Sequence, residues 1–450
     1  MNGRFIAKPF LSERSLLSRG DSWRAVLSRL RYLDQYLLHD VSPRSLAAVT
    51  RGLGSRRTRQ VLRVERSIVS SDRDYYRHTT AGLPRIESLT GLRWFAVLAV
   101  FFSHNVPGGN TRSWVSSLFG SGYMGVTVFF VLSGFILTVT YGDSLSEPTW
   151  SRVGNYAVAR FARIYPVYLF VLLYVVFSTA SSSSLPSGWW QHFFAIQAWN
   201  SDVNFAYALN GPGWSIGVET FMYAMFPLLI LIFRPLLRTP ARGLLLACGA
   251  VIFIAAAWFY FRQTGRAGLP VEDPASAHRW LYRMPAMRLG DFVLGIGASA
   301  AFLGLRGRAG VHKWAPWVAT LSSILIIALM ATPKLFRSAI SWDLLYAVPA
   351  AVLIFALALT PDRGLARFLG TRPLVALGEM SYAFFLVHVP IGGLMFGGVL
   401  AAGFTPLSVA TLVMGLLMTI CLSWGIHLLV ERPARIWIRR HAFSRHAPAL

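Results

Sequence analysis

Long apolar stretches alternate with short polar segments along most of this chain, from residue 91 to residue 429. The stretches lack the alternation of apolar and polar positions that is typical of barrel strands, and unpaired backbone cannot face lipid. Because a helix needs about 20 residues to cross the hydrocarbon core, the pattern predicts about ten transmembrane helices. Their predicted ranges are 91–106, 122–141, 163–180, 214–233, 244–261, 287–304, 316–332, 343–360, 378–402 and 407–429.

The composition supports a membrane protein and excludes several other classes. Of the 450 residues, 54% are hydrophobic and only 14% are charged, whereas a water-soluble domain carries roughly 25% charged residues. The same numbers, with a mean hydropathy of +0.50, exclude a disordered chain. Two cysteines are too few for a large disulfide-stapled ectodomain. The prediction is therefore an all-α polytopic membrane protein.

Positive charge is distributed unevenly between the two sets of connecting segments. The formal net charge is +24, but the basic residues flank apolar runs, where the lipid bilayer rather than nucleic acid is the expected partner. The N-terminal segment, the loops that follow even-numbered spans and the C-terminal tail hold 34 Lys and Arg, and the opposite loops hold 7. This bias predicts cytoplasmic termini and a multi-pass protein of the inner (plasma) membrane. The loop with Arg262, Arg266, Arg279 and Arg283 is the exception.

The chain divides into three parts by composition. Residues 1–84 hold no apolar stretch long enough for a signal peptide, and we expect a basic cytoplasmic segment there. Apolar residues between Trp23 and Leu37 recur at helical spacing, which fits either an amphipathic helix on the membrane or a solvated tail. Residues 85–437 form the predicted transmembrane domain, and residues 438–450 a cytoplasmic tail.

Ionisable side chains inside apolar helices are costly and therefore mark candidate functional positions. Arg93 and His104 are eleven residues apart, which puts them on one helix face and about 16 Å apart along the axis. Arg93 is expected at the cytoplasmic edge, and His104 near or beyond mid-membrane. An imidazole there suits general-base work near neutral pH, although a hydrogen-bonded packing histidine is the alternative. His388, near mid-membrane in the span 378–402, is the rival candidate.

Two further groups of polar residues lie at different expected depths. Arg160 and Arg163 are three residues apart, so they can share a helix face and clamp a phosphate, or simply flank a membrane span. Glu219 and the pair Arg288 and Asp291, one turn apart, are expected in the outer half. A cationic inner mouth suits a polyanionic cytosolic donor, and a polar outer pocket suits a hydroxyl-rich acceptor.

Two other features have both a structural and a functional interpretation. Ser133 lies near mid-membrane beside Gly134, where small residues usually indicate close helix packing. The loop 181–213 holds three tryptophans and no Lys or Arg, which is typical of a lid or a sugar-stacking surface.

Seven fragments in order resemble one known family. They are RIESLTGLRWFAVLAVFFSH, GVTVFFVLSGFIL, RFARIYPVY, WSIGVETFMY, RLGDFVLG, SYAFFLVHVP and VERPARIW. Together they resemble the acyltransferase type 3 family, the bacterial integral-membrane O-acyltransferases of the O-antigen and exopolysaccharide acetylase kind. The resemblance covers about residues 85–437. It implies acyl-CoA as the cytosolic donor, with acetyl as the expected acyl group, and a hydroxyl of a cell-surface or lipid-linked carbohydrate as the acceptor.

The resemblance also assigns roles, with two departures from the family pattern. The family usually has two consecutive acids where Glu219 is followed by Thr220, and a Glu where this chain has Asp291. No metal is expected, and acyl-CoA is a co-substrate rather than a bound cofactor. The predicted residues are His104 and Glu219 for catalysis, Arg93, Arg160 and Arg163 for acyl-CoA, and Ser133, Trp214, Arg288, Asp291 and His388 for the acceptor or for support.

Other functions fit parts of the same pattern. A bundle with polar groups at mid-membrane also suits a transporter or flippase for a glycan or a lipid-linked intermediate, although the chain lacks the inverted repeats typical of carriers. Within the enzyme class, the acceptor could instead be a small secreted metabolite such as a macrolide sugar.

Overall fold

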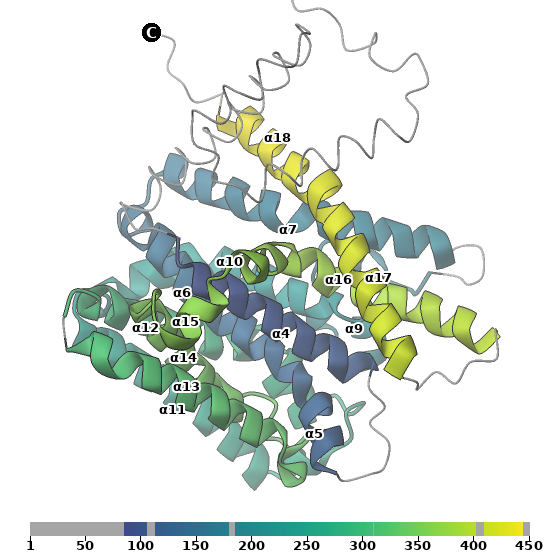
Figure 1. Cartoon of the computed structure of the whole chain (residues 1–450), viewed down its shortest axis with the longest axis horizontal. Coiled ribbons are helices and arrows are strands. Elements are labelled where there is room, and N and C mark those ends of the chain that lie inside the picture. The colour runs from purple at the N-terminus through teal and green to yellow at the C-terminus, as the bar shows by residue number, and fades with distance from the viewer. Residues whose placement is uncertain (1–84, 106–112, 180–184, 309, 402–408, 444–450) are drawn as a thin grey trace, which may run out of the picture. The chain divides into compact units, whose positions relative to one another are not determined.

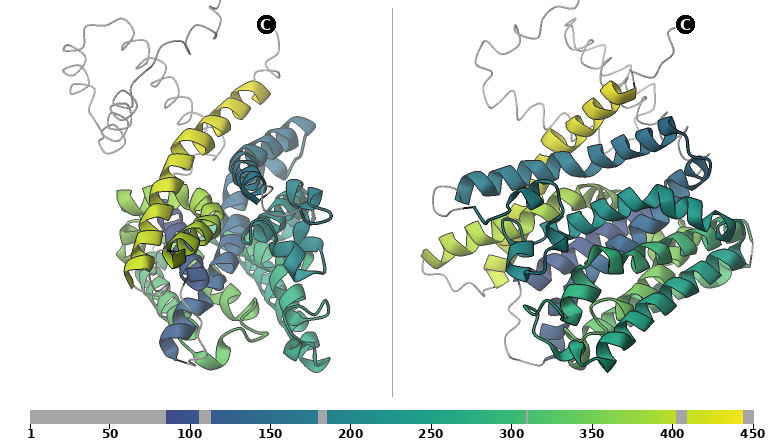
Figure 2. Two further views of the ribbon diagram at one scale, coloured as in Figure 1. Left: turned by 90° about the vertical axis from the view of Figure 1, so that its right-hand side faces the viewer. Right: turned by 180° about the vertical axis from the view of Figure 1, so that it is seen from behind.

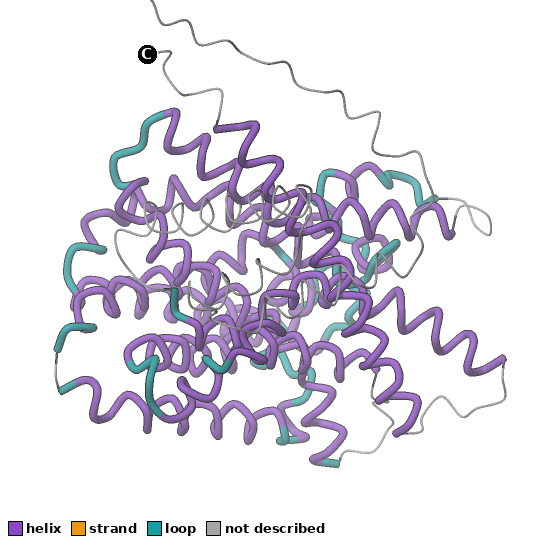
Figure 3. Tube along the Cα trace, turned by 45° about the horizontal axis from the view of Figure 1, so that its top comes forward, coloured by secondary structure: helices purple, strands orange, loops and turns teal. Residues whose placement is uncertain are grey.

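The computed structural model describes residues 85–105, 113–179, 185–308, 310–401 and 409–443. Within these ranges every regular element is a helix (Figure 3), which confirms the predicted all-α class. Residues 1–84, including the helical pattern between Trp23 and Leu37, lie outside the described residues, as do residues 444–450. The cytoplasmic location of both termini therefore stays a prediction.

Each of the ten predicted spans corresponds to one helix of the described chain. Eight stretches there are long and apolar enough to cross a membrane. The other two expected spans are α14, with 16 residues, and α4, whose apolar run is interrupted by Arg93 and His104. The ten helices are α4 (Glu87–Asn105), α6 (Met124–Leu145), α7 (Trp150–Thr179), α10 (Gly213–Phe233), α11 (Pro240–Gln263), α12 (Pro285–Leu305), α13 (Val311–Met330), α14 (Leu344–Leu359), α16 (Arg372–Ala401) and α17 (Val409–Ile426).

Shorter helices connect the long ones. After α17, a π-helical turn η8 (His427–Glu431) leads into α18 (Arg432–Phe443), so the predicted boundary at 437/438 falls inside a helix. The part of the loop 181–213 that the structure describes is folded into short helices, and its three tryptophans are exposed. The remaining short elements are α5 (Trp114–Gly120), η2 (Ser121–Tyr123), α8 (Trp190–Phe193), η3 (Gln197–Trp199), α9 (Val203–Tyr207), η4 (Arg234–Leu236), η5 (Arg266–Gly268), η6 (His278–Arg283), η7 (Pro333–Leu335) and α15 (Gly364–Leu369).

Helix α4 is enclosed by other helices. It packs against α6, α14, α15 and α16, and α16 lies alongside it in Figure 1. Helix α18 crosses α7 and contacts it, as the two further views of Figure 2 also show. This arrangement brings side chains of α6, α7, α10, α16 and η8 to the polar positions of α4 and its neighbours.

Helices α6 and α12 approach each other closely at two glycines. A Cβ atom at Gly134 would lie 2.0 Å from the carbonyl oxygen of Phe292, and one at Gly295 would lie 2.0 Å from that of Val131. Because no side chain fits there, the backbones can touch. The packing interpretation of the Ser133–Gly134 element thus holds for Gly134, while Ser133 is available for a polar contact.

Candidate active site

His104 and His388 contact each other near the end of α4. Nε2 of His388 lies 3.1 Å from Nδ1 of His104, because α16 packs along α4. His388 is fully buried and lies beside the rings of Phe101 and Phe384, whereas the side chain of His104 is exposed. The two histidines that the sequence treats as rivals therefore form one pair.

The surrounding carbonyl groups assign the protons of this pair. Nδ1 of His388 lies 2.7 Å from the carbonyl oxygen of Phe385, and Nδ1 of His104 lies 3.0 Å from that of Val100. A carbonyl oxygen can only accept, so both Nδ1 atoms carry the hydrogen. Nε2 of His388 is then the acceptor for His104, and Nε2 of His104 keeps its lone pair on the exposed ring.

The second polar group, which we call the arginine cluster, consists of Arg93, Arg160 and Arg163 with Glu219 and Tyr223. Oε1 of Glu219 accepts hydrogen bonds from Oγ of Ser133, at 3.2 Å, and from the hydroxyl of Tyr223. Arg93 lies within electrostatic range of Glu219, Tyr223 and Arg163. The structure thus links Glu219 to Ser133 and Arg93 directly, to Arg163 through Arg93, and to Arg160 through the ring of Tyr223.

Arg160 is surrounded by tyrosines. Its Nη2 donates to the hydroxyl of Tyr141 at 3.1 Å, and its guanidinium lies over the rings of Tyr141 and Tyr223, 5.2 and 5.7 Å from their centroids. Its Nε is buried without a hydrogen-bond partner among the described residues. The charge of Arg160 is therefore held by phenol groups and ring faces, and these neutral groups do not cancel it.

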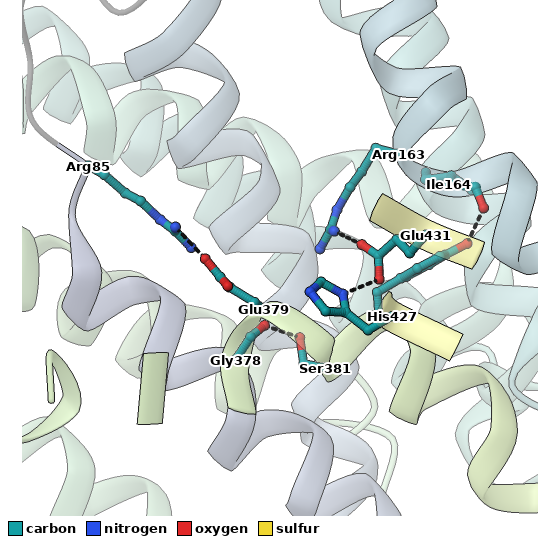
Figure 4. A network of polar contacts seen from close by, with 9 residues as sticks. Arg85, Arg163, Ile164, Gly378, Glu379, Ser381, His427 and Glu431 are labelled. Carbon is teal, nitrogen blue, oxygen red and sulfur yellow. Dashed lines mark hydrogen bonds and ion pairs between the residues drawn. The ribbon is translucent and has the colours of Figure 1, made fainter. Parts of the chain in front are cut away.

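Arg163 has a carboxylate partner that the sequence did not suggest. It forms an ion pair with Glu431 of η8, and the other carboxylate oxygen of Glu431 lies 2.9 Å from Nδ1 of His427 (Figure 4). Its guanidinium also faces the ring of Tyr382 at 5.7 Å. Figure 4 shows a second ion pair near this network, between Arg85 and Glu379 at 2.5 Å. The VERPARIW fragment contains Glu431, but no local pattern there indicates its partner.

Glu219 lies in a different group from the one that its depth suggested. The sequence placed it with Arg288 and Asp291 in the outer half and predicted it as a catalytic residue beside His104. Instead it bonds to α6 through Ser133, because α10 presents this face to α6 and α7. The side chain that contacts His104 is His388.

Arg288 and Asp291 form a fully buried ion pair, as their spacing predicts. Nη2 of Arg288 lies 2.7 Å from Oδ2 of Asp291, and Nη1 lies 3.0 Å from Oδ1 of Asp343. Arg288 also donates to Oγ1 of Thr127 at 2.7 Å and to the carbonyl of Trp342 at 3.2 Å. This network joins α6, α12 and the start of α14, which favours the structural role. Asp343 was missed, although an acid at the first position of the predicted span 343–360 is a detectable signal.

Trp214 belongs to a buried group that we call the aromatic cluster: Tyr123, Trp214, His278, Tyr282 and Trp342. The ring centroid of Tyr282 lies 4.8 Å from that of Trp214 and 5.3 Å from that of Trp342. Tyr123 lies 5.0 Å from Trp342 on the other side. The cluster covers Arg288, whose guanidinium is 6.0 Å from the ring of Tyr282. Four loops and helices thus meet at one packed group of rings.

Comparison with known proteins identifies the family. The family described as "Acyltransferase domain" matches residues 86–428. The chain belongs to this family. It is a multi-pass membrane acyltransferase, and the resemblance drawn from the seven fragments is confirmed. Among the described residues, no group of three or more His, Cys, Asp and Glu is arranged to hold a metal ion.

Several named relatives are similar to this acyltransferase. It is 32% identical over 390 residues to the acyltransferase MdmB of Streptomyces mycarofaciens, with 81% of this chain and 95% of that protein covered. It is 24% identical over 333 residues to the peptidoglycan O-acetyltransferase OatA of Listeria monocytogenes, with 68% and 49% covered. For the O-acetyltransferase OatA of Staphylococcus aureus the identity is 24% over 347 residues, with 71% and 53% covered. The chain therefore spans about half the length of the two OatA proteins. No solved structure matches.

Proposed function

We propose that this protein is a membrane-bound O-acyltransferase. It moves an acyl group, with acetyl as the expected one, from cytosolic acyl-CoA to a hydroxyl of a cell-surface or lipid-linked carbohydrate. The observation that carries the proposal is the exposed ring of His104, whose Nε2 keeps a lone pair while His388 holds its Nδ1 hydrogen. The O-acetyltransferase relatives, one of them named for peptidoglycan, support a carbohydrate acceptor.

The arginine cluster is the proposed site for the phosphates of the donor. Guanidinium groups bind phosphate through charge-assisted hydrogen bonds; in this cluster Arg93 interacts electrostatically with Arg163 and Glu219, and Arg160 lies over Tyr223. Arg93 and His104 share α4 and are separated by about 16 Å along its axis. The pantetheine arm of a CoA thioester would extend over this distance, from the arginine cluster to His104.

The proposed reaction needs one base and no redox step. Nε2 of His104 accepts the proton of the acceptor hydroxyl while the hydroxyl oxygen forms a bond to the thioester carbonyl carbon. The C–S bond breaks, its electron pair goes to sulfur, and the proton on His104 passes to the CoA thiolate. The products are an ester and free CoA, and His104 returns to its starting form. The same lone pair could instead accept the acyl group briefly before the hydroxyl attacks.

Radiolabelled acetyl-CoA tests the proposal. The purified protein in lipid nanodiscs is incubated with labelled acetyl-CoA and carbohydrate acceptors, and both CoA release and labelled ester are measured. We expect His104→Ala to abolish both while the variant elutes as folded protein. His441→Ala, a control at an exposed histidine of α18, should retain both activities. Full activity in His104→Ala would contradict the proposed base, and the absence of CoA release by the wild type would favour a transporter.

A further inference from the structure

Two of the loops from the set with only seven Lys and Arg contact each other in the structure. The first, 262–283, ends in η6, and the second, 333–342, precedes α14. The centroid of the His278 ring, in the first, lies 4.8 Å from that of the Trp342 ring, in the second. Of the seven basic residues on that side of the chain, six lie in these two segments. The basic residues that form the exception to the positive charge bias therefore lie mainly in two loops that contact each other.

Arg337 is held in a conformation that bulky residues rarely adopt. Its φ is +52°, in the left-handed region, where a residue with a Cβ atom persists only if its surroundings fix it. Its backbone N–H donates to the hydroxyl of Tyr123 at 3.2 Å, and this hydroxyl donates to Oγ of Ser341 at 2.7 Å. The side chain of Arg337 is exposed. The loop thus fixes the backbone from which this exposed guanidinium extends.

This loop lies within electrostatic range of the proposed base. Tyr123 belongs to η2, which lies directly on the last turns of α4, because a Cβ atom at Gly122 would be 1.8 Å from the carbonyl oxygen of Ala99 and 3.2 Å from Cβ of Ser103. Ser103 immediately precedes His104. The charge of Arg337 accordingly acts on the ring of His104.

Positive charge exceeds negative charge in these two loops, which hold six basic residues and two acids, Glu272 and Asp273. Arg283 donates to the carbonyl oxygens of Asn200 and Ser201 at 2.6 and 3.1 Å, and the acid whose charge reaches it is Asp202. Burial, with the charges of Arg283 and Arg337, lowers the pKa of His278 to about 3. This histidine is therefore neutral at physiological pH. In the described part of the chain, the arginine ion pairs are formed by Arg85, Arg163, Arg234 and Arg288, and none of them includes Arg283 or Arg337.

We propose that Arg337 binds an anionic group of the acceptor, a carboxylate or a phosphate close to the hydroxyl that reacts at His104. The inference rests on the proposed function and deepens it, because it names the chemical class of the acceptor. An exposed arginine in a positive region attracts an anion and orients it through two parallel hydrogen bonds. The acceptor is then an acidic or phosphorylated sugar, and Arg337 determines specificity without touching the reacting atoms.

Matched acceptors test this specificity. N-acetylglucosamine is compared with N-acetylmuramic acid, which adds a carboxylate, and with N-acetylglucosamine 1-phosphate, which adds a phosphate. The wild type should prefer at least one anionic sugar in kcat/KM. Arg337→Gln should lower that preference at least tenfold, Arg337→Lys should keep most of it, and Lys334→Gln, which removes an exposed charge from the same loop, should not change it. The two anionic sugars distinguish a carboxylate from a phosphate site.

Two outcomes would overturn the inference. One is a wild type that prefers the neutral sugar; the other is an Arg337→Gln variant that loses transfer to neutral and anionic sugars equally. If the wild type transfers no acyl group at all, the proposed function fails instead. In that case, thermal stabilisation by N-acetylmuramate or inorganic phosphate still decides the inference. Stabilisation that Arg337→Gln abolishes supports the anion site, and its absence in the wild type rejects it.

Discussion

Replacing His388 separates the positioning of the proposed base from its chemistry. His388→Ala removes one of the two acceptors near the Nδ1 hydrogen of His104, so the ring is held less firmly in its orientation and tautomer. Loss of the hydrogen bond that orients a metal-bound histidine typically costs about 10–100-fold, and a wrong tautomer of a catalytic histidine about 10⁴-fold. Since the carbonyl of Val100 still lies 3.0 Å from the same nitrogen, we expect the lower range, about 10–100-fold in kcat.

The KM for acyl-CoA should stay close to the wild-type value. The proposed phosphate site lies at the other end of α4, around Arg93, and His388 does not touch it. Steady-state CoA release in nanodiscs gives kcat and KM separately. This split distinguishes loss of orientation at His104 from general disruption of the helix bundle, which would raise KM as well.

His388→Gln is the matched control. The buried ring of His388 packs beside Phe101, Phe384 and Phe385, so truncation to Ala also leaves a cavity. Gln retains most of the volume, and its Oε1 can accept the Nδ1 hydrogen of His104. We expect it to recover much of the lost kcat. The reasoning is refuted if His388→Ala stays within threefold of the wild type, or if both variants are equally slow while only the Ala variant loses thermal stability.

Two further substitutions test the arginines. Arg160→Ala should weaken acyl-CoA binding about tenfold or more, measured by titration calorimetry with CoA, because its charge is not cancelled by a carboxylate partner; unchanged CoA affinity would count against the phosphate site. Arg288→Met should destabilise the fold by about 3–5 kcal/mol, because it leaves Asp291 and Asp343 buried without a positive charge. Detergent-solubilised protein would then unfold at a lower temperature, and a wild-type melting curve would contradict the structural role of this network.

Properties that depend on one segment at a time were predictable from the sequence. Hydropathy located all ten helices, for instance the span 343–360 for the helix Leu344–Leu359. The one-turn spacing of Arg288 and Asp291 predicted their ion pair, because helix geometry alone brings these side chains together. The Arg93–His104 spacing likewise placed these two residues at different levels of one helix.

Contacts between distant segments were not predictable in the same way. His388 is 284 residues from His104, and Glu431 is 268 residues from Arg163. Depth in the membrane limits which residues can meet, but the rotation of each helix selects the partner. Glu219 shows the difference, because its helix turns it toward Ser133 of α6 rather than toward Arg288 of α12. This rotation follows from the packing of several helices together, for which a single sequence carries no local signal.

The partners of Arg288, Arg163 and Arg160 indicate how available each arginine is for a ligand. Arg288 has two carboxylates and neutral acceptors within reach, so a phosphate would have to compete with the protein itself. Arg163 has one carboxylate, Glu431, which must move or be shared when an anion binds. Arg160 has phenol groups that stabilise the cation without cancelling its charge. Since the attraction for an incoming phosphate depends on the charge that remains uncancelled, Arg160 should contribute more to acyl-CoA affinity than Arg163, although the two lie on one face of α7.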